Sequence, residues 1–515
     1  MFRNIVFVID PFSAVCYNYS SIVSEVFVMD SLKIGWSQIS ITPDLPVYNG
    51  GQIYPRVSKY VHDPLYATAL ALDSGSSQAV LVSLDIMCVP PRSITDKIRG
   101  AVRDLEGFDP RCISFSATHT HNSIQDTPWL FSRDAIDFFG AEKFAVPNQP
   151  KDILDGVALN DFLITRVTQA IREAWQNRKD GRIATASDYA VVAFNRRPVF
   201  QTRDGAKTQM YGVCSHKSFQ GFEGGSDHSI DMIYTYDPLG TLTGIAVCVP
   251  CPSQVFELHS FLTADYWYYA RSAIRERLGP VPVLSLCGAS GDQNPIDLVR
   301  ISKYNECELQ TWSAQAGEVF RNFDMTDLCR DIASRISDAV LRGYKKAQPW
   351  VSPIIDHRTE MIRLPIRKVS EQDYQKAVEI INKEKAAFSC EHPLKGPDLV
   401  RIFEPLGVYS RYLQQKRSPY VEVPLHAWRI NSLVMASCPF ELFVDYAFRI
   451  KARTSAEQPV VLQMTDDYLD YLPTSQALKG GSYSSAPAST TCGPESGDIL
   501  VEEMLALMND LWEKR

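Results

Sequence analysis

The sequence has little of several features that mark common protein classes. It contains 12 cysteines in 515 residues, too few for a disulfide scaffold. Lysine and arginine number 52 against 60 acidic residues, so the net charge is −8 and no basic surplus exists to neutralise phosphates. No apolar run reaches a membrane-spanning length. We therefore expect neither a nucleic-acid binder nor a protein with a transmembrane segment.

The N-terminal segment is apolar enough to raise the question of a signal peptide. Asp10 interrupts its apolar run, and no small-residue cleavage site follows a run of sufficient length. We therefore predict a cytoplasmic protein with mostly reduced cysteines. Residues 1–32 are interpreted as an N-terminal extension, within which Met29 is an alternative start.

Short β-branched runs recur along the chain, and each ends in polar or metal-competent residues. Such runs predict buried strands, and the helical patterns between them (265–278, 370–388 and 498–515) indicate an α/β fold. Ligands gather beyond the carboxyl ends of strands in α/β sheets, which favours one site built from distant segments. The alternative is that strand ends are polar only because loops are. The runs are 78–85, 111–122, 243–253, 281–295, 431–441 and 459–471.

The sharpest local motif is the His119-Thr120-His121 sequence. In an extended backbone, residues two apart face the same side, so both imidazoles would enter one pocket. One ring would bind a metal ion while the other transfers a proton. Two solvated loop histidines are the alternative. The sequence has no HExxH, GxSxG, EF-hand or kinase motif.

Other candidates carry weaker signals from the residues alone. Cys248 and Cys251 form a CxxC without a second such pair, so a structural zinc ribbon is disfavoured and buried, inert thiols are the default. The turn 288–295 has glycines that either admit a ligand or only make the turn. Glu441 is either a site residue or a helix N-terminal acid, and Tyr468 and Tyr471 are either site residues or core aromatics. These residues predict a histidine-centred hydrolytic metalloenzyme without indicating its substrate.

The ordered motifs together resemble the neutral/alkaline (non-lysosomal) ceramidase family across residues 33–515. The strongest segment is SATHTHN (116–122), which resembles the family's THTHSGPGG box without its glycines. The resemblance implies one large α/β catalytic domain of mixed sheets with flanking helices, lacking the C-terminal immunoglobulin-like domain. A charged helical insertion falls around 367–418. The other similar segments are IGWSQISITPDLP (34–46), VHDPLYATALAL (61–72), VLVSLDI (80–86), NRR (195–197), CPSQ…TADY (251–266), GDQNP (291–295), PFELFVDYAFRIK (439–451) and DDYLDYLPTSQALKGGSY (466–483).

The resemblance also implies a single Zn²⁺ ion as cofactor. By position, its ligands would be His119, Cys251, Glu441 and Tyr471, where Cys251 stands at the place of the family's second zinc histidine. A thiolate is a legitimate zinc ligand, so such a site is chemically possible. His121, together with Tyr471, would support the developing oxyanion.

Further residues are implied around that ion. Asn294 replaces the serine of the family's GDVSPN segment and would orient the substrate, although an asparagine cannot be a nucleophile. Arg196, Asp292 and Tyr483 would bind substrate. We therefore predict a zinc-dependent hydrolase of an N-acyl amide, acting through metal-activated water on a small-molecule or lipid-like substrate. Two alternatives stay open: a catalytically degenerate relative that binds a lipid or sugar conjugate, and a thiol enzyme that depends on Cys251.

Overall fold

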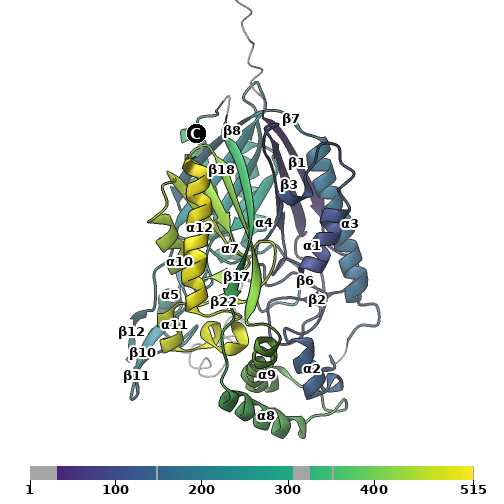
Figure 1. Cartoon of the computed structure of the whole chain (residues 1–515), viewed down its shortest axis with the longest axis vertical. Helices are drawn as coiled ribbons and strands as arrows, with labels where there is room; N and C mark the ends of the chain where they lie inside the picture. Colours follow the sequence, from purple (N-terminus) through teal and green to yellow (C-terminus); the bar gives the residue numbers. More distant parts are fainter. Residues whose placement is uncertain (1–31, 147–148, 305–324, 351–352, 514–515) are drawn as a thin grey trace, which may run out of the picture.

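The computed structural model of this chain describes residues 32–146, 149–304, 325–350 and 353–513. Three mixed sheets form its centre, and helices cover their outer faces (Figure 1). The prediction of an α/β fold with mixed sheets and flanking helices is confirmed. Of the predicted N-terminal extension, residues 1–31 lie outside the described residues, and the limits of the predicted catalytic domain stay a prediction.

The first sheet has the strand order β5-β4-β3-β1-β7. Along β4, Val80 and Val82 pack on the side of helix α3 (Gly156–Gln176), whereas Leu81 faces the other sheets. This alternation follows from the two-residue period of a strand. The bounds of the strands are β1 Lys33–Ser40, β3 Tyr66–Asp73, β4 Gln78–Leu84, β5 Ile113–Ala117 and β7 Lys179–Asp180.

The second sheet has the order β15-β14-β13-β8, and helices α4 and α7 cover it. The helix predicted at 265–278 is confirmed as α4 (Tyr266–Leu278). The Asp265 carboxylate accepts a hydrogen bond from the first helical N–H, and Gly279 follows with a φ of 95°. The remaining bounds are β8 Arg182–Tyr189, β13 Ser229–Tyr236, β14 Leu242–Val249, β15 Val283–Cys287 and α7 Thr326–Lys346.

The third sheet has the order β17-β18-β19-β21, and α12 (Pro494–Glu513) lies along its outer face (Figure 1). The helix predicted at 498–515 corresponds to α12, and the apolar residues of one of its faces are buried: Leu500, Met504, Leu507, Met508 and Leu511. The strand bounds are β17 Ile355–Pro365, β18 Tyr420–Ile430, β19 Leu433–Ser437 and β21 Gln458–Leu462.

One apolar cluster joins the three sheets at the centre of the molecule, with Leu81, Leu284 and Met435 each contributed by a different sheet. Each sheet also contains a parallel pair, namely β4/β5, β14/β15 and β19/β21. The shorter elements lie around this centre: β2 Tyr48–Asn49, β6 Ile124–Gln125, β9 Phe194–Asn195, β10 Pro198–Thr202, β11 Gly205–Thr208, β12 Phe219–Phe222, β16 Gln293–Asn294, β20 Glu441–Leu442, β22 Tyr471–Leu472, α1 Arg92–Gly100, α5 Leu298–Tyr304, α10 Val444–Lys451 and α11 Ser475–Gly480.

The charged segment 367–418 forms two helices, α8 (Glu371–Lys385) and α9 (Gly396–Arg417). The helix predicted at 370–388 is confirmed in α8, where the Ser370 hydroxyl accepts a hydrogen bond from the Asp373 N–H at 3.0 Å and donates to the Asp373 carboxylate at 2.6 Å. Together with α2 (Arg133–Phe139), these helices make a separate lobe at the lower end of Figure 1. Its apolar contacts include the stacked rings of Phe138 and Tyr409, 4.3 Å apart.

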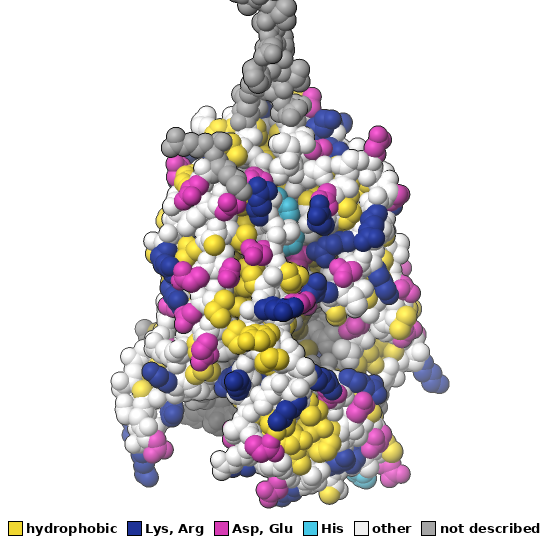
Figure 2. Space-filling model, viewed as in Figure 1, with side chains coloured by type: hydrophobic (Ala, Val, Ile, Leu, Met, Phe, Trp, Pro, Cys, Tyr) yellow, Lys and Arg dark blue, Asp and Glu magenta, His cyan; other side chains and the backbone are white. Residues whose placement is uncertain are grey.

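The distribution of surface charge and the state of the cysteines are as the composition led us to expect. On the face shown in Figure 2, basic and acidic side chains are interspersed rather than gathered into a basic stripe. No disulfide joins any of the ten cysteines within the described residues. No helix in the described part of the chain is long and apolar enough to cross a membrane.

Candidate active site

The parallel strand pairs of the three sheets bring their carboxyl ends together. Backbone contacts join the segments that follow them: Ser116 bridges to Thr465, and Gly288 bridges to Leu462. The side chains that emerge there come from the chain after β5, β14, β15, β19 and β21. The prediction that these strand ends share one location is confirmed. That prediction rested on the tendency of ligand sites to lie at this edge of a sheet.

The two motif histidines meet at this point, but not in the way that the sequence suggested. His119 has a φ of 60°, so its backbone is left-handed and the expectation of extended backbone is wrong. Its N–H donates to the carbonyl of Ile86 after β4, which turns the chain away from β5. The rings of His119 and His121 nevertheless pack edge to face with centroids 4.8 Å apart. Both residues are buried, so the alternative of two solvated loop histidines is wrong.

His119 faces a carboxylate directly. Its Nε2 lies 3.2 Å from Oε2 of Glu441, and its Nδ1 lies 2.7 Å from the carbonyl oxygen of Met87. A carbonyl oxygen only accepts, so Nδ1 carries the proton. In a neutral ring, Nε2 then presents a lone pair to the carboxylate. Burial raises the pKa of Glu441, but the positive charges of a protonated His119 and of Arg196 would outweigh burial and bring the net pKa below its usual value.

Glu441 is placed by strand pairing. It lies in the two-residue strand β20, which pairs in parallel with β22 so that Glu441 is opposite Tyr471. It is therefore a site residue and not the N-terminal acid of α10, which begins at Val444. Gly291 makes this approach possible, because a Cβ there would lie 2.3 Å from the backbone oxygen of Glu441. Gly291 thus allows close approach of the Glu441 backbone, whereas approach of a ligand to this turn stays a prediction.

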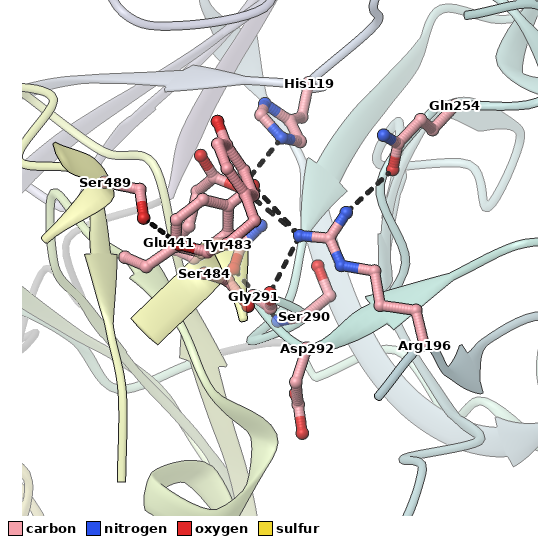
Figure 3. A network of polar contacts seen from close by, with 12 residues as sticks. His119, Arg196, Gln254, Ser290, Gly291, Asp292, Glu441, Tyr483, Ser484 and Ser489 are labelled. Atoms are coloured by element: carbon pink, nitrogen blue, oxygen red, sulfur yellow. Dashed lines mark hydrogen bonds and ion pairs between the residues drawn. The ribbon is translucent and has the colours of Figure 1, made fainter. Parts of the chain in front are cut away.

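Arg196 is the centre of the polar network in Figure 3. Its guanidinium donates to the Tyr471 hydroxyl at 2.9 Å and to the Gly291 carbonyl at 2.9 Å, and it lies 3.9 Å from Glu441 Oε2. It also donates to the Gln254 side-chain oxygen at 3.3 Å. A buried guanidinium whose planar donors are held in this way is suited to bind a negatively charged oxygen.

Three tyrosines line the same side of the site. The Tyr468 hydroxyl donates to Glu441 Oε1 at 3.0 Å, and the Tyr483 ring lies perpendicular to that of Tyr471 with centroids 5.7 Å apart. Tyr483 also contacts Phe403 of α9, with centroids 5.6 Å apart. The helical lobe therefore reaches one wall of the site.

The two polar residues of the glycine turn have different positions. Asn294 is buried and interacts with Tyr211, whose hydroxyl accepts from Arg196 at 3.1 Å. Asp292 points away from the site in Figure 3. Its carboxylate accepts from the Val444 N–H at 3.0 Å, at the start of α10, and from the Asn195 amide at 2.9 Å. The structure thus brings Asn294 to the Arg196 network and gives Asp292 a supporting position behind it.

Cys251 is not placed with the other predicted metal ligands. Its fully buried sulfur lies 3.6 Å from the Pro252 carbonyl oxygen and 3.9 Å from that of Val192. No group of three or more His, Cys, Asp or Glu side chains in the described ranges is arranged to hold a metal ion. Cys251 therefore does not complete a site with His119 and Glu441. Burial also raises the pKa of its thiol well above the usual value, which disfavours a reactive thiolate.

Without Cys251, the candidate zinc ligands are His119, Glu441 and Tyr471, and zinc requires its ligand atoms to lie at a defined separation. At usual Zn–N and Zn–O bond lengths, two tetrahedral ligand atoms lie ~3.4 Å apart. The 3.2 Å between His119 Nε2 and Glu441 Oε2 fits that separation, and the Nδ1–H bond to a carbonyl is typical of a metal-binding histidine. Tyr471 hydrogen-bonds Glu441 and is the available third donor. The donor set therefore fits as His/Glu/Tyr with Cys251 outside it.

An apolar cavity of about 260 Å³ adjoins this cluster. Tyr468 forms the connection, because its ring lines the cavity while its hydroxyl contacts Glu441. Met87 lines the same cavity, and its carbonyl holds His119. Most of the other walls are apolar and come from the segment after β4, from β6 and its following loop, and from α3: Ile86, Val89, Pro90, Ile124, Trp129, Leu130, Leu159 and Leu163.

Three residues of the network escaped prediction from the sequence. Gln254 and Glu257 lie in the segment 251–266, where an acid in an apolar stretch (VFELHSF) was a signal that could have been followed. Tyr211 carries no signal, because an isolated tyrosine in a loop is compatible with any environment. Its contact with Arg196 depends on the fold alone.

Comparisons with known proteins agree with this architecture. The chain is similar to a crystal structure of neutral ceramidase from Pseudomonas aeruginosa, with a TM-score of 0.63 and 15% identity over 94% of this chain and 75% of that chain. A structure described as ceramidase complexed with C2 gives a TM-score of 0.62 and 16% identity, over 94% and 76% of the two chains. No family model and no curated protein sequence matches. The chain has a ceramidase-like fold.

Proposed function

We propose that this protein hydrolyses a linear N-acyl amide at the cluster of His119, Glu441 and Arg196. One observation carries the proposal: the Nδ1 of His119 is bonded to a carbonyl, so a lone pair on Nε2 faces the Glu441 carboxylate at 3.2 Å. Two acceptors at that distance need a proton or a metal cation between them. The likeness to ceramidase structures supports the choice of amide hydrolysis.

We propose Zn²⁺ as the cation, with His119, Glu441 and Tyr471 as its protein ligands. Three protein ligands with a fourth position open is the usual arrangement of catalytic zinc. When bound, zinc would polarise the amide carbonyl and lower the pKa of the attacking water. This set differs from the predicted one only in leaving out Cys251, whose sulfur contacts backbone carbonyls.

The other residues supply orientation and charge. Arg196 is fixed by Tyr471, Gly291 and Gln254, so its guanidinium is oriented before the substrate arrives and stabilises negative charge on the amide oxygen. His121 accepts a proton from the attacking water and returns it to the leaving nitrogen. The buried position of the cluster excludes bulk water and strengthens these interactions.

The apolar cavity beside Tyr468 supports an amide that carries a hydrocarbon chain. Its volume of about 260 Å³ would hold part of such a chain, and its contact with Glu441 through Tyr468 would put the amide at one end. We therefore propose a lipid-like amide as the substrate class. Each methylene buried there would add ~0.8 kcal/mol to binding.

The test is amide turnover by zinc-loaded protein over a series of N-acyl amides of increasing chain length. We expect hydrolysis that improves with chain length and falls at least about 100-fold in His119→Ala. His216→Ala is the matched control, because this exposed histidine hydrogen-bonds Ser218 of its own loop and has no place in the cluster described above. Absence of turnover in the wild type, or equal turnover in His119→Ala, would refute the proposal. Binding without turnover would favour the alternative of a catalytically degenerate protein that binds a lipid or sugar conjugate. The asparagine at 294, where the ceramidase family has a serine, also motivates that alternative.

A further inference from the structure

A buried carboxyl group beside the catalytic cluster has no role in the reaction described above. Glu257 lies in the loop after β14, and its Oε2 is 3.5 Å from Nδ1 of His121. The same oxygen accepts a hydrogen bond from the Gln254 amide at 2.7 Å. Burying a carboxyl group is costly unless it has partners, so this position needs an explanation.

A buried arginine fixes the backbone of both residues. The Arg56 guanidinium donates to the backbone carbonyl of Glu257 at 2.7 Å and to that of His121 at 2.6 Å. It also donates to the carbonyls of Gly50 and His259. One planar group therefore ties the two segments together with several charge-assisted hydrogen bonds. The distance between the Glu257 carboxyl and the His121 ring is thus set by the main chain.

The backbone of Gly51 packs against the His121 side chain where the side chain leaves the main chain. Gly51 has a φ of 98°, and a Cβ at this position would lie 2.6 Å from the Cβ of His121. The backbone of Gly51 therefore packs directly on the histidine. Held in this way, the ring directs Nε2 to within 3.4 Å of His119 Nε2, at the reaction centre. Nδ1 faces Glu257.

We propose that Glu257 is a positioning residue that accepts the Nδ1–H of His121 and keeps Nε2 free as the proton acceptor of the reaction. The inference rests on the proposed function. Water transfers one proton to Nε2 as its oxygen bonds to the carbonyl carbon. The C–N bond then breaks, and the same proton passes to the leaving nitrogen, so no further reactant is required. A carboxylate that orients a histidine through its other nitrogen is an established means of fixing the tautomer.

A competing arrangement exists in the same contacts. The Gln254 amide nitrogen lies 3.4 Å from His121 Nδ1 and could donate to it, which would place the ring proton on Nε2. That amide nitrogen carries two protons, and the shorter of its two contacts, 2.7 Å, is to Glu257. A carboxylate is also the stronger acceptor for an N–H group, since the bond is charge-assisted. The charge of Glu257 therefore favours the proton on Nδ1, whereas the contacts of His121 with Gln254 and His119 also suit a proton on Nε2, so the position of this proton is the point that the experiments below decide.

The first experiment is a double-mutant cycle on amide turnover with Glu257→Gln and His121→Ala. We expect Glu257→Gln to lower kcat by about 10- to 100-fold with KM within about twofold, and Glu257→Asp to restore part of that loss. In the His121→Ala background, the same substitution should change kcat by less than about twofold. The matched control is Glu173→Gln, a partly buried glutamate of α3 that bonds Ser37 and Gln169. An unchanged kcat, or an equal loss in both backgrounds, would overturn the inference.

The second experiment does not depend on activity. Full-length protein labelled with ¹⁵N-histidine, with His121→Ala used for assignment, reports which ring nitrogen of His121 carries the proton. We expect the Nδ1–H form in the wild type at pH 8 and its loss in Glu257→Met, which removes the acceptor and keeps the length of the side chain. A wild-type ring protonated on Nε2 would contradict the role of Glu257. If no amide is hydrolysed but the ring is protonated on Nδ1, only the proposed function fails.

Discussion

Two clusters of ionisable side chains in this protein have nearly the same chemical composition, although the outer one is only partly buried. The inner cluster contains His119 and His121 with a carboxylate, Glu441, and an arginine, Arg196. The outer cluster contains His357 and His426, whose rings lie 5.2 Å apart, with Asp466 and Arg99. Each consists of two histidines in contact, one carboxylate and one guanidinium. Residue types alone therefore do not separate a reactive site from a structural one.

The direction of the hydrogen bonds distinguishes the two clusters. In the outer one, His357 Nε2 lies 3.0 Å from His426 Nδ1, and His426 Nε2 lies 3.1 Å from Asp466 Oδ2. If both rings are neutral and protonated on Nε2, His357 donates to His426 and His426 donates to Asp466, so no two lone pairs face each other. In the inner cluster, the carbonyl of Met87 takes the Nδ1 proton of His119 and leaves such a conflict at Glu441. The inner cluster therefore needs a proton or a metal cation between His119 and Glu441, and it alone of the two adjoins the apolar cavity at Tyr468.

The largest expected difference is between the two carboxylates. Glu441→Gln should lower kcat by about 1,000-fold, because it removes the charge that faces His119 and the reaction centre. Asp466→Asn should change kcat by less than about tenfold, since Asp466 contacts Arg99 and the Phe115 N–H instead. Steady-state amide turnover of both variants measures this contrast. Equal losses would remove the distinction between the clusters.

The two arginines should differ by a smaller factor. Arg196→Lys removes the planar donors that reach Tyr471 and Gly291, so we expect kcat/KM to fall by about 100-fold with little change in the unfolding midpoint. Arg99→Lys should leave kcat/KM nearly unchanged and reduce the free energy of unfolding by roughly 1–2 kcal/mol, because Arg99 bonds the buried Asp466. Steady-state turnover gives kcat/KM and denaturant unfolding gives the free energy of unfolding for each of the two variants. If Arg196→Lys lowered the free energy of unfolding without lowering kcat/KM, the assignment of Arg196 to the reaction would be contradicted.

The third prediction concerns acid stability of the outer cluster. Burial, with the charge of Arg99, lowers the pKa of His426 to about 3, so the unfolded chain binds this proton first. His426 therefore stabilises the fold above about pH 6.5, and this contribution is lost as the pH falls toward 3. Burial raises the pKa of Asp466 to about 6, which opposes part of that loss between pH 6 and 4.

The variant His426→Gln tests this pH dependence. Between pH 7 and pH 4, its free energy of unfolding should fall by roughly 1–3 kcal/mol less than that of the wild type. His357 contacts the same ring and is left in place. Denaturant unfolding at several pH values provides the measurement. An identical pH dependence in the two proteins would show that His426 does not titrate in this way.

The smallest expected effect is at Cys251. Cys251→Ser should retain zinc and amide turnover within about threefold, because the sulfur contacts the carbonyls of Pro252 and Val192 and not the other donors. Metal content by mass spectrometry and kcat provide the readouts. Loss of stoichiometric zinc would instead support the ligand role that the family resemblance implied.

The sequence predicted the elements of the fold better than the details of the site. Strand runs and helix caps are local signals, and the runs at 78–85 and 281–295 are strands as expected. The convergence of His119 and Glu441 was also inferred, from the family resemblance. The left-handed backbone of His119 was not, because it results from a hydrogen bond to Ile86, which follows a neighbouring strand.

Residues fixed by tertiary contacts were outside the reach of sequence patterns. Cys251 was assigned by alignment with a histidine, but the direction of a side chain depends on the loop that carries it. Arg56 donates to the backbone carbonyl of Glu257, 201 positions away along the chain, and no periodicity encodes such a contact. The outer pair was missed for the same reason, since His357 and His426 meet only through the pairing of β17 and β18.

The most direct test of the central claim is anomalous X-ray diffraction at the zinc edge from crystals of the zinc-loaded protein. The account predicts one peak within about 2.0–2.3 Å of His119 Nε2 and of the Glu441 carboxylate, with the Cys251 sulfur outside bonding distance. It also predicts no peak between His357 and His426. A peak at the outer pair, or no peak at His119, would contradict the claim that the inner cluster alone holds a metal cation.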